Sequence, residues 1–548
     1  MQFLISKQKN IFSNFGLYGL FVFKMILLLS ALCMLLISLA DIKPLEASTL
    51  QTVRIGLTFR FHEVQSIPIT DRSIVLGHNR NGSFTPIITK NTTSGFTVSI
   101  PTGHYAKISN SFSSYAEAQM QGIGTILFNG DEYILLSGPF STAAEAQNLG
   151  TVYTPSTQSV LLSADNSPAI IFDTDRFMQV TPVSGSDSIG LGDRRFRGVV
   201  EFGRFRGQNI TAVNIVPLEQ YLFSVVPSEM PASWHMEALR AQAIAARSYT
   251  INRSGVHAAE GFDLCDGVHC QVYIGRGNES QRTTYAVNST AGRFAFFNDQ
   301  IINATYFSSS GGVTDNSENV WLNPTPYLIS VIETAETEFR QWQRTFTMAE
   351  LTQLANSGAN NIGTVQSVTV IHQFNGRVGR LTLNGTSGNR TLQREEIRTF
   401  FSGSPDGSLL SRNFYISGTN PPQIGQGQSI AHVGNSPISI QSVSGDLTSA
   451  LAREVHVLGQ EGSTATRSEL SVIGQSSAVV YGGQGGSSGQ TPNLPETTTH
   501  STGNSVTFIG RGHGHGVGMS QFGARGMAEA GYTYREIIAF YYNGAIIR

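Results

Sequence analysis

The stretch that most constrains this chain is residues 213–253, which read VNIVPLEQYLFSVVPSEMPASWHMEALRAQAIAARSYTINR. Proline lacks a backbone N–H, so the helix predicted to begin at Pro217 should end at Pro227. Pro227 and Pro231 then mark a tight turn that contains one acidic residue, Glu229. The sequence therefore predicts a carboxylate held in a short turn between two helices.

A long Ala-rich helix is predicted over residues 234–252, with Ser233 as its N-cap. Small side chains recur on one face of this helix, namely Ala238, Ala241, Ala245 and Ser248. Because small residues permit close approach, we expect this face to pack against a sheet.

Length and charge narrow the class of protein. A chain of 548 residues is too long for one core, so several domains are expected. Charged residues make up 14% and nearly cancel, with 36 Lys and Arg against 38 Asp and Glu. The balance lacks the basic excess typical of proteins that bind nucleic acid or an anionic membrane surface, so neither is expected as a partner of the folded part.

The N-terminus has the pattern of an export segment. Basic residues precede an uncharged apolar run at residues 25–40, as in a secretory signal. LEAS at residues 45–48 offers a cleavage site, and the alternative is an uncleaved membrane anchor. Residues 1–47 are therefore predicted to be a signal peptide or anchor. The rest of the chain is expected outside the cytoplasmic membrane, in the periplasm or cell wall.

Two similar segments follow the first strands. Residues 52–99 alternate apolar and polar positions and are predicted to be the first strands of the main domain. YAKISNSFSSYAEAQMQ, from Tyr105, then aligns with YILLSGPFSTAAEAQNL, from Tyr133, and each copy predicts a strand, a turn and a helix start. Residues 100–155 resemble the SPOR domain, a small module that binds peptidoglycan glycan without stem peptides. The alternative is a generic pair of βα units without a ligand, and either one could be inserted into the main domain.

The main domain is predicted to continue over residues 158–548. Alternating apolar residues indicate further strands, interrupted by a helical segment at residues 348–357. The Gly/Ser-rich residues 482–503 predict a flexible loop. Two helices are expected near the C-terminus, one from about Ser520 and one from about Tyr534.

Glu229 is a candidate catalytic acid on its chemistry alone. Cleavage of a glycosidic bond requires a proton on the leaving oxygen, and one Glu suffices if the sugar's own 6-hydroxyl attacks. Such an acid needs a raised pKa, which burial among Phe223, Met230 and Trp234 would provide. The expected position of Glu229 near a helix N-terminus would instead favour the charged form. The alternative is a helix-capping or ion-paired Glu.

A Cys/His cluster and a Gly/His loop also carry chemistry. His257, Cys265, His269 and Cys270 are the ligand types of a tetrahedral zinc site, although a Cys265–Cys270 disulfide is an equal alternative on spacing alone. With all ligands supplied by the protein, such a zinc would be structural.

The Gly/His loop reads GRGHGHGVGMSQ, residues 510–521. Its glycines suggest a backbone that approaches a ligand, with His513 and His515 as sugar contacts. The alternative is a stiff turn.

Residues 213–253 resemble the signature of the SpoIID/LytB family. The resemblance extends through FDLCDGVHCQVY at residues 262–273, ATYFSSSGG at residues 304–312 and GRGHGHGVGMSQFGARGMAEAG at residues 510–531, in the family's order. It implies a lytic transglycosylase that acts on denuded peptidoglycan glycan, with Glu229 as the catalytic acid.

The resemblance also implies roles for other residues. Arg247 and Gln271 are expected near the cleavage site, Ser308 and Ser309 with His513 and His515 are expected to bind substrate, and the Cys/His cluster is expected to hold structural zinc. A hydrolase would need a second carboxylate, for which Asp315 and Glu318 are candidates. No serine hydrolase is predicted, because a G-x-S-x-G elbow does not accompany the serines.

The fold class expected is α+β: a strand-rich SpoIID-like domain with a long Ala-rich catalytic helix, plus the small βα–βα SPOR-like module. The expected partner is peptidoglycan glycan. LytB-type members are amidase enhancers, so the alternative function is a non-catalytic wall-binding protein that stimulates an N-acetylmuramoyl-L-alanine amidase.

Overall fold

The computed structural model describes residues 52–422, apart from 123, 166, 207, 337–339, 358–360 and 374, and residues 497–548. Between these ranges it describes short strands: β26 (Ile438–Gln441), β27 (Leu447–Ala450), β28 (His456–Leu458) and β29 (Thr464–Thr466). The predicted signal or anchor at residues 1–47 lies outside the described residues. Among the helices that are described, none combines the length and the hydrophobicity needed to cross a bilayer.

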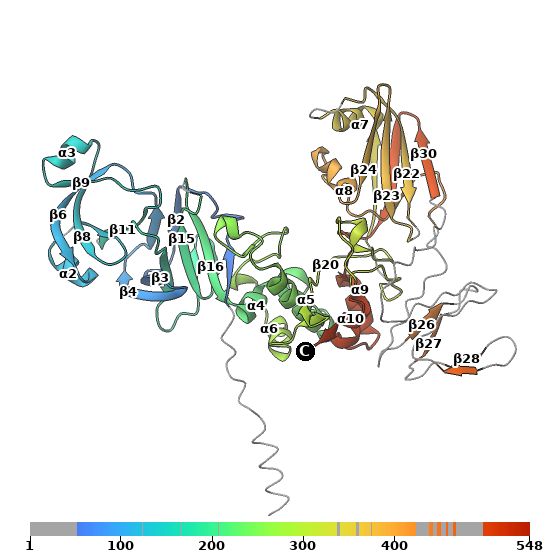
Figure 1. The fold of residues 1–548 in the computed structure, drawn as a ribbon, viewed down its shortest axis with the longest axis horizontal. Helices are drawn as coiled ribbons and strands as arrows, with labels where there is room; N and C mark the ends of the chain where they lie inside the picture. Colours follow the sequence, from blue (N-terminus) through green and yellow to red (C-terminus); the bar gives the residue numbers. More distant parts are fainter. Residues whose placement is uncertain are drawn as a thin grey trace, which may run out of the picture. The chain divides into compact units, whose positions relative to one another are not determined.

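The predicted first strand, VRIGL, lies inside a large sheet of the main domain (Figure 1). The sheet runs in the order β17 (Leu264–Cys265), β1 (Thr52–Gly56), β16 (Thr211–Pro217), β15 (Val199–Gly203), β12 (Met178–Pro182), β3 (Ser73–Arg80), β4 (Ser83–Asn91). Parallel pairing of β1 with β17 sets Gly56 opposite Cys265. The Cys/His segment is therefore attached to the edge of this sheet.

A second sheet contains the internal repeat. Its order is β14 (Arg194–Phe196), β13 (Ile189–Leu191), β2 (Ser66–Ile69), β5 (Phe96–Ser99), β10 (Val160–Ala164), β11 (Ser167–Phe172), β7 (Thr125–Phe128), β8 (Tyr133–Phe140), β6 (His104–Phe112), β9 (Thr151–Tyr153). Helix α2 (Tyr115–Met120) follows β6 and α3 (Ala143–Gln147) follows β8. The repeat therefore forms a βαββαβ unit with strand order β7-β8-β6-β9, a ferredoxin-like arrangement.

This βαββαβ unit is continuous with the rest of its sheet. Strand β11 pairs in parallel with β7, with Ile170 opposite Ile126 and Phe172 opposite Phe128. The side chains of Ile126, Phe128 and Ile170 belong to the same apolar core as the main-domain strands. The unit is thus built into the main core, as an insertion that shares its backbone hydrogen bonds.

Helices around the predicted turn differ from expectation at their ends. Helix α4 (Leu218–Glu229) continues through Pro227, which was predicted to end it, and α5 (Met236–Arg253) is capped by His235, where Ser233 was expected. Pro227 cannot donate a backbone hydrogen bond, but α4 continues only to Glu229 and keeps other bonds in its last turn. There the Ser228 hydroxyl donates to the carbonyl of Ser224 at 2.8 Å, and the N–H of Met230 bonds to the Val226 carbonyl at 2.9 Å.

The small face of α5 is buried as predicted, but mainly against helices. Its neighbours include α4, α6 (Gln281–Ser289), α9 (Gln521–Glu529) and α10 (Tyr534–Tyr541), which surround it in Figure 1. Ala238, Ala241 and Ala245 are fully buried there. The expected packing against a sheet is limited to contacts with β18 (Ala295–Phe297) and β19 (Gln300–Ile301), which form a small sheet with β33 (Ile546–Ile547).

A short parallel pair joins two distant motifs. Strand β20 (Tyr306–Phe307) pairs with β32 (Met519–Ser520), with Tyr306 opposite Met519. An isolated bridge continues the contact from Ser309 to His513. The Tyr-Phe-Ser-Ser segment and the Gly/His loop are therefore neighbours in space. The two C-terminal helices, α9 and α10, begin where the sequence predicts them.

The segment between these motifs has an apolar core of its own. One sheet runs β21 (Gln341–Thr347), β31 (Ser505–Arg511), β25 (Phe414–Ile416), and another runs β24 (Asn389–Gln393), β23 (Val378–Gly385), β22 (Val365–His372), β30 (Thr497–Thr502). The expected helix at 348–357 is α7 (Met348–Ala355), and α8 (Glu396–Thr399) follows later. Strand β30 corrects the predicted flexible loop, because residues 497–502 pair with β22; residues 482–496 lie outside the described residues.

Candidate active site

Glu229 is the last residue of α4, and the chain turns away at Met230 with an extended backbone. The sequence analysis considered the N-terminus of the following helix, whereas the structure places the carboxylate on the C-terminus of α4. At a helix C-terminus the exposed carbonyls carry partial negative charge, which disfavours a carboxylate. The helix field thus acts in the same direction as burial.

Hydrogen-bond donors from separate segments converge on the Glu229 carboxylate. The N–H of Val272 donates to Oε1 at 3.1 Å, and Nε2 of Gln521 donates to Oε2 at 3.4 Å. The Tyr306 hydroxyl also lies near the carboxylate and favours its ionised form. Burial raises the pKa of Glu229, and these hydrogen bonds oppose the rise without cancelling it. Because the residue remains partly exposed, a ligand can still reach it.

The apolar setting predicted for Glu229 is present in part. Met230 is fully buried behind the carboxylate-bearing turn, whereas Phe223 and Trp234 are partly buried and pack against the main core. Trp234 lies edge-on to Phe522 of α9, with 5.0 Å between the ring centroids. The turn that carries Glu229 is therefore apolar on its buried side and is joined to α9 by an aromatic contact.

Gln271 holds Tyr306 and is itself out of reach of a substrate. Its Nε2 donates to the Tyr306 hydroxyl at 2.9 Å, while its Oε1 accepts from Thr250 at 2.7 Å and from Tyr221 at 3.3 Å. The side chain is 1% exposed. The predicted substrate contact is therefore corrected to a supporting role, in which Gln271 fixes the position of the tyrosine that lies beside Glu229.

Arg247 also differs from its predicted role. Its guanidinium is fully buried and forms a paired contact with Glu219, at 2.8 Å from Nε and 2.7 Å from Nη2. It donates further to the carbonyls of Ala243, Val287 and Arg293. With its donors directed inward, Arg247 fastens the first turn of α4 to α5 and α6, and does not meet a substrate.

The serine loop divides into buried and accessible residues. Ser309 is buried, and its hydroxyl donates to Glu336. Ser310 donates to the same carboxylate from its N–H at 2.9 Å and its hydroxyl at 2.6 Å. The predicted sugar contact by Ser309 is thus replaced by a bond to Glu336, which holds the loop. Ser308 is partly exposed and stays a candidate for substrate binding.

The histidines of the Gly/His loop are held in neutral form. The N–H of Val517 donates to Nδ1 of His515 at 3.1 Å, so Nε2 carries the proton and donates to the Tyr306 carbonyl at 3.1 Å. Burial lowers the pKa of His515 to about 3. His515 therefore supports the backbone of Tyr306. Burial also lowers the pKa of His513, which is partly exposed and bridges to Ser309.

Of the two carboxylates proposed for a hydrolase, Asp315 is unavailable, whereas Glu318 is partly exposed. Asp315 is fully buried, pairs with Arg377 at 3.2 Å and accepts a hydrogen bond from Arg412. Its charge is thus committed to the interior. Glu318 lies in the turn η3 (Ser317–Asn319) and accepts from the Ser317 hydroxyl at 3.4 Å.

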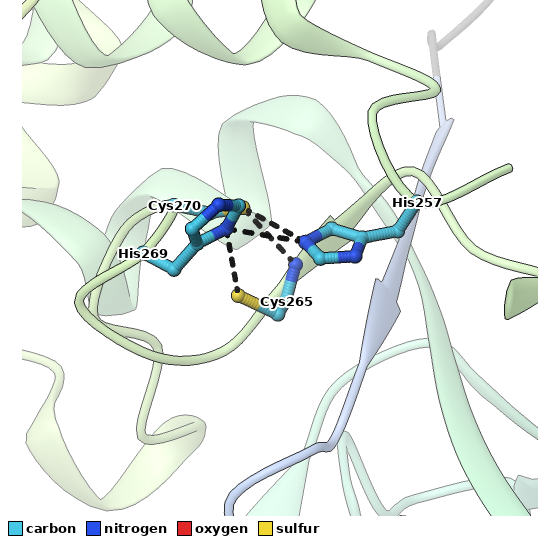
Figure 2. A group of neighbouring side chains, drawn as sticks. All are labelled: His257, Cys265, His269 and Cys270. Atoms are coloured by element: carbon cyan, nitrogen blue, oxygen red, sulfur yellow. Dashed lines mark hydrogen bonds between the residues drawn. The ribbon is translucent and has the colours of Figure 1, made fainter. Parts of the chain in front are cut away.

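The Cys/His cluster assembles as Figure 2 shows, with the four side chains of His257, Cys265, His269 and Cys270 directed toward one another. Nε2 of His257 lies 3.3 Å from Nδ1 of His269, and Sγ of Cys270 lies 3.5 Å and 3.4 Å from these nitrogens. Sγ of Cys265 lies 3.9 Å from Nδ1 of His269. Tetrahedral zinc with ordinary Zn–N and Zn–S bonds separates its ligand atoms by about 3.3 to 3.8 Å. The residues therefore fit zinc.

The surroundings of the cluster are also those of a metal site. Oε1 of Glu260 lies 3.1 Å from Nδ1 of His257, the nitrogen that faces away from the cluster. A carboxylate in this position orients a ligating histidine. Cys265 and Cys270 are free thiols in the structure, so the alternative disulfide is not formed.

Tyr306 and Gln521 are the parts of the site that sequence reasoning did not identify. Both occur within motifs that the sequence analysis identified, ATYFSSSGG and GHGHGVGMSQ. In these motifs only the serines and histidines were predicted to bind substrate. Tyr306 is the first residue of β20, and Gln521 directly follows β32. These two strands pair in parallel. Only the pairing brings them to the same carboxylate.

Comparison with known proteins identifies related sequences. Residues 206–297 match the family model SpoIID, described as stage II sporulation protein. Residues 316–434 match a domain of unknown function, DUF8618. The first match contains Glu229 and the Cys/His cluster, and the second contains most of the segment with its own core.

Relatives with curated names extend the similarity. The chain is 30% identical to an amidase enhancer of Bacillus subtilis over 374 residues, which is 66% of this chain and 45% of that protein. It is 27% identical to stage II sporulation protein D of the same organism over 363 residues, or 63% of this chain and 77% of the relative. These matches support the SpoIID family and a function related to the cell wall. The aligned part spans less than half of the amidase enhancer.

Proposed function

We propose that this protein is an exported peptidoglycan lytic transglycosylase that cleaves the bond between N-acetylmuramic acid and N-acetylglucosamine in denuded glycan strands. The observation that carries the proposal is Glu229: a partly exposed carboxyl with a pKa raised by burial, at the meeting point of segments that the family similarity singles out. A raised pKa keeps a fraction of the carboxyl protonated where an ordinary Glu is ionised.

Glu229 would act first as an acid and then as a base. Its proton passes to the glycosidic oxygen as the bond from that oxygen to C1 breaks. The 6-hydroxyl of the same N-acetylmuramic acid then attacks C1, and its proton returns to the Glu229 carboxylate. The product is a 1,6-anhydro ring with no water consumed, and the enzyme is restored to its starting protonation state.

The commitment of Asp315 to Arg377 and Arg412 supports this route over hydrolysis. A hydrolase uses a second carboxylate to activate water or to form a covalent intermediate. Asp315, one of the two candidates for that role, is fully buried, which leaves Glu318 as the other candidate. The hydroxyls of Tyr306 and Ser308 and the ring of His513 are the polar groups that we assign to the substrate side of the site.

We assign His257, Cys265, His269 and Cys270 to a structural zinc ion. When bound, zinc would cross-link the segment between α5 and Gln271 and would supply no open position for a reacting water. Cys270 directly precedes Gln271 and Val272, which contact Tyr306 and Glu229. The chemistry of the reaction requires no cofactor in this proposal.

The βαββαβ unit of residues 104–153 is proposed to be the SPOR-like module that binds denuded glycan, and the N-terminal segment is proposed to direct export. The amidase enhancer relative favours one rival function, a wall-binding protein that stimulates an N-acetylmuramoyl-L-alanine amidase without cutting glycan itself. In that case Glu229 would be dispensable.

Digestion of amidase-treated sacculi separates these functions. The wild-type protein should release peptide-free glycan fragments with 1,6-anhydro ends, detected by mass spectrometry. The activity of Glu229→Gln should be lower by a factor of at least about one hundred. Glu396→Gln, at the exposed start of α8, is the matched control and should cut normally. Reducing ends in place of anhydro ends would exclude a transglycosylase. Undiminished activity in Glu229→Gln would exclude the assigned acid.

A further inference from the structure

Trp321 is an exposed aromatic residue close to the candidate active site. It is 36% exposed and is followed by Leu322, which is 70% exposed. Its ring centroid lies 5.2 Å from that of His515, whose Nε2 donates to the carbonyl of Tyr306. Tyr306 in turn lies beside Glu229, so Trp321 is linked to the proposed catalytic carboxyl through His515 and Tyr306.

The loop that carries Trp321 is held firmly although it contains little regular structure. The N–H of Trp321 bonds to the Ser317 carbonyl at 2.7 Å, and the Ser317 hydroxyl accepts from the N–H of Thr325 at 2.7 Å. Asn316 accepts from the N–H of Ser330 at 2.7 Å. These bonds fix the backbone of both arms of the loop, and the ring of His515 packs against the indole.

The base of the loop is fixed to its surroundings by Asp315. Its N–H donates to the Gly516 carbonyl at 2.7 Å, which joins the loop to the Gly/His motif. Its carboxylate pairs with Arg377 and Arg412, both fully buried in the segment with its own core. Two buried arginines from the segment with its own core therefore hold the base of the loop.

We propose that Trp321 is a stacking platform for a sugar ring of the bound glycan, at a position beyond the bond that is cut. The faces of pyranose rings carry C–H groups, which pack against the electron-rich face of an indole. A pre-organised loop lowers the entropy lost on binding. The proposal rests on the proposed function for the identity of the glycan, and it deepens that function: the site grips several consecutive sugars, not one disaccharide.

The test measures binding separately from cleavage. Full-length Glu229→Gln protein is titrated calorimetrically with chitohexaose and with purified denuded glycan strands, alone and combined with changes at Trp321. Trp321→Leu removes the aromatic face but keeps an apolar side chain, and should weaken binding about fivefold to tenfold. Trp321→Phe keeps an aromatic ring and should weaken binding less than about threefold. Leu322→Ala is the matched exposed control and should bind within about twofold of the parent.

The outcomes separate this proposal from the function on which it rests. Equal affinities of Trp321→Leu and Trp321→Phe, or an equal loss in Leu322→Ala, would overturn the stacking role, as would no binding of either ligand by the parent. If Trp321-dependent binding is found but wild-type protein does not cut sacculi, the stacking role stands and the transglycosylase proposal fails. Thermal melting of each variant shows that the loop and its support remain folded.

Discussion

At the residue scale, the raised pKa that suits the Glu229 carboxyl to acid catalysis also makes its ionised form destabilise the folded protein. Burial and the C-terminal end of α4 both disfavour its charge, while Val272 and Gln521 stabilise it only in part. The folded protein therefore binds this proton more tightly than the unfolded chain does. Where the carboxyl is ionised in both states, the folded state bears a cost that the unfolded state lacks.

This cost predicts a pH-dependent gain from Glu229→Gln. The raised pKa means that stability from the protonated carboxyl is complete below the ordinary pKa of 4.5 and is lost as pH rises through the folded-state pKa. The variant should therefore melt at a higher temperature than wild type at about pH 8, and the difference should vanish at about pH 4. Differential scanning calorimetry at both pH values measures it.

Glu350→Gln is the control of opposite sign. Hydrogen bonds from the N–H and hydroxyl of Thr347 lower the pKa of Glu350 at the start of α7. Removing its charge should give no gain at high pH. A Glu229→Gln variant less stable than wild type at high pH would show that the carboxylate is stabilised, not strained, by its surroundings.

Arg247 tests the correction of a predicted substrate contact. Loss of one partner of a buried ion pair costs about 3 to 5 kcal/mol of unfolding free energy, so Arg247→Gln should be strongly destabilised in a urea titration. Arg240→Gln, on the same helix, breaks a partly exposed pair with Glu237 and should cost about 1 kcal/mol or less. A stable Arg247→Gln enzyme with a raised KM for glycan strands would restore the substrate role.

At the element scale, the segment from His257 to Val272 connects the proposed metal to the site. This segment follows α5 and contains the four residues of the Cys/His cluster. Its strand β17 pairs with β1, and the N–H of its last residue, Val272, donates to Glu229. Phe262 and Leu264 anchor this segment in apolar clusters, and a bound metal would add a second constraint on it.

Metal analysis tests this constraint without reference to activity. Purified protein should contain about one zinc per chain by mass spectrometry. Cys265→Ser and His257→Gln should lose the metal and melt at lower temperature. His62→Gln changes a histidine that lies near Glu260 but outside the cluster, and should keep the metal. A metal-free wild-type protein, or full occupancy in Cys265→Ser, would contradict the assignment.

At the scale of the whole molecule, the sequence predicted helices and strands better than the long-range contacts between them. Periodicity located the strands, α5, α7, α9 and α10, because each depends on local pattern. It misjudged Pro227, because the last turn of α4 forms despite the backbone hydrogen bond that this proline cannot make. It also misjudged Arg247, whose partner Glu219 is 28 residues away in sequence. Tyr306 reaches Glu229 only through long-range pairing, which no local pattern encodes.

The parallel pair of β7 and β11 has a mechanical consequence. A module attached by a linker can be pulled from the wall without disturbing its neighbour, whereas strands hydrogen-bonded side by side transmit force directly into the adjoining core. If residues 104–153 grip the glycan, tension in the strand reaches the sheet that packs with the main core. The region that binds the glycan and the region that cuts it would then be mechanically coupled, so that tension in the glycan strand would act on both.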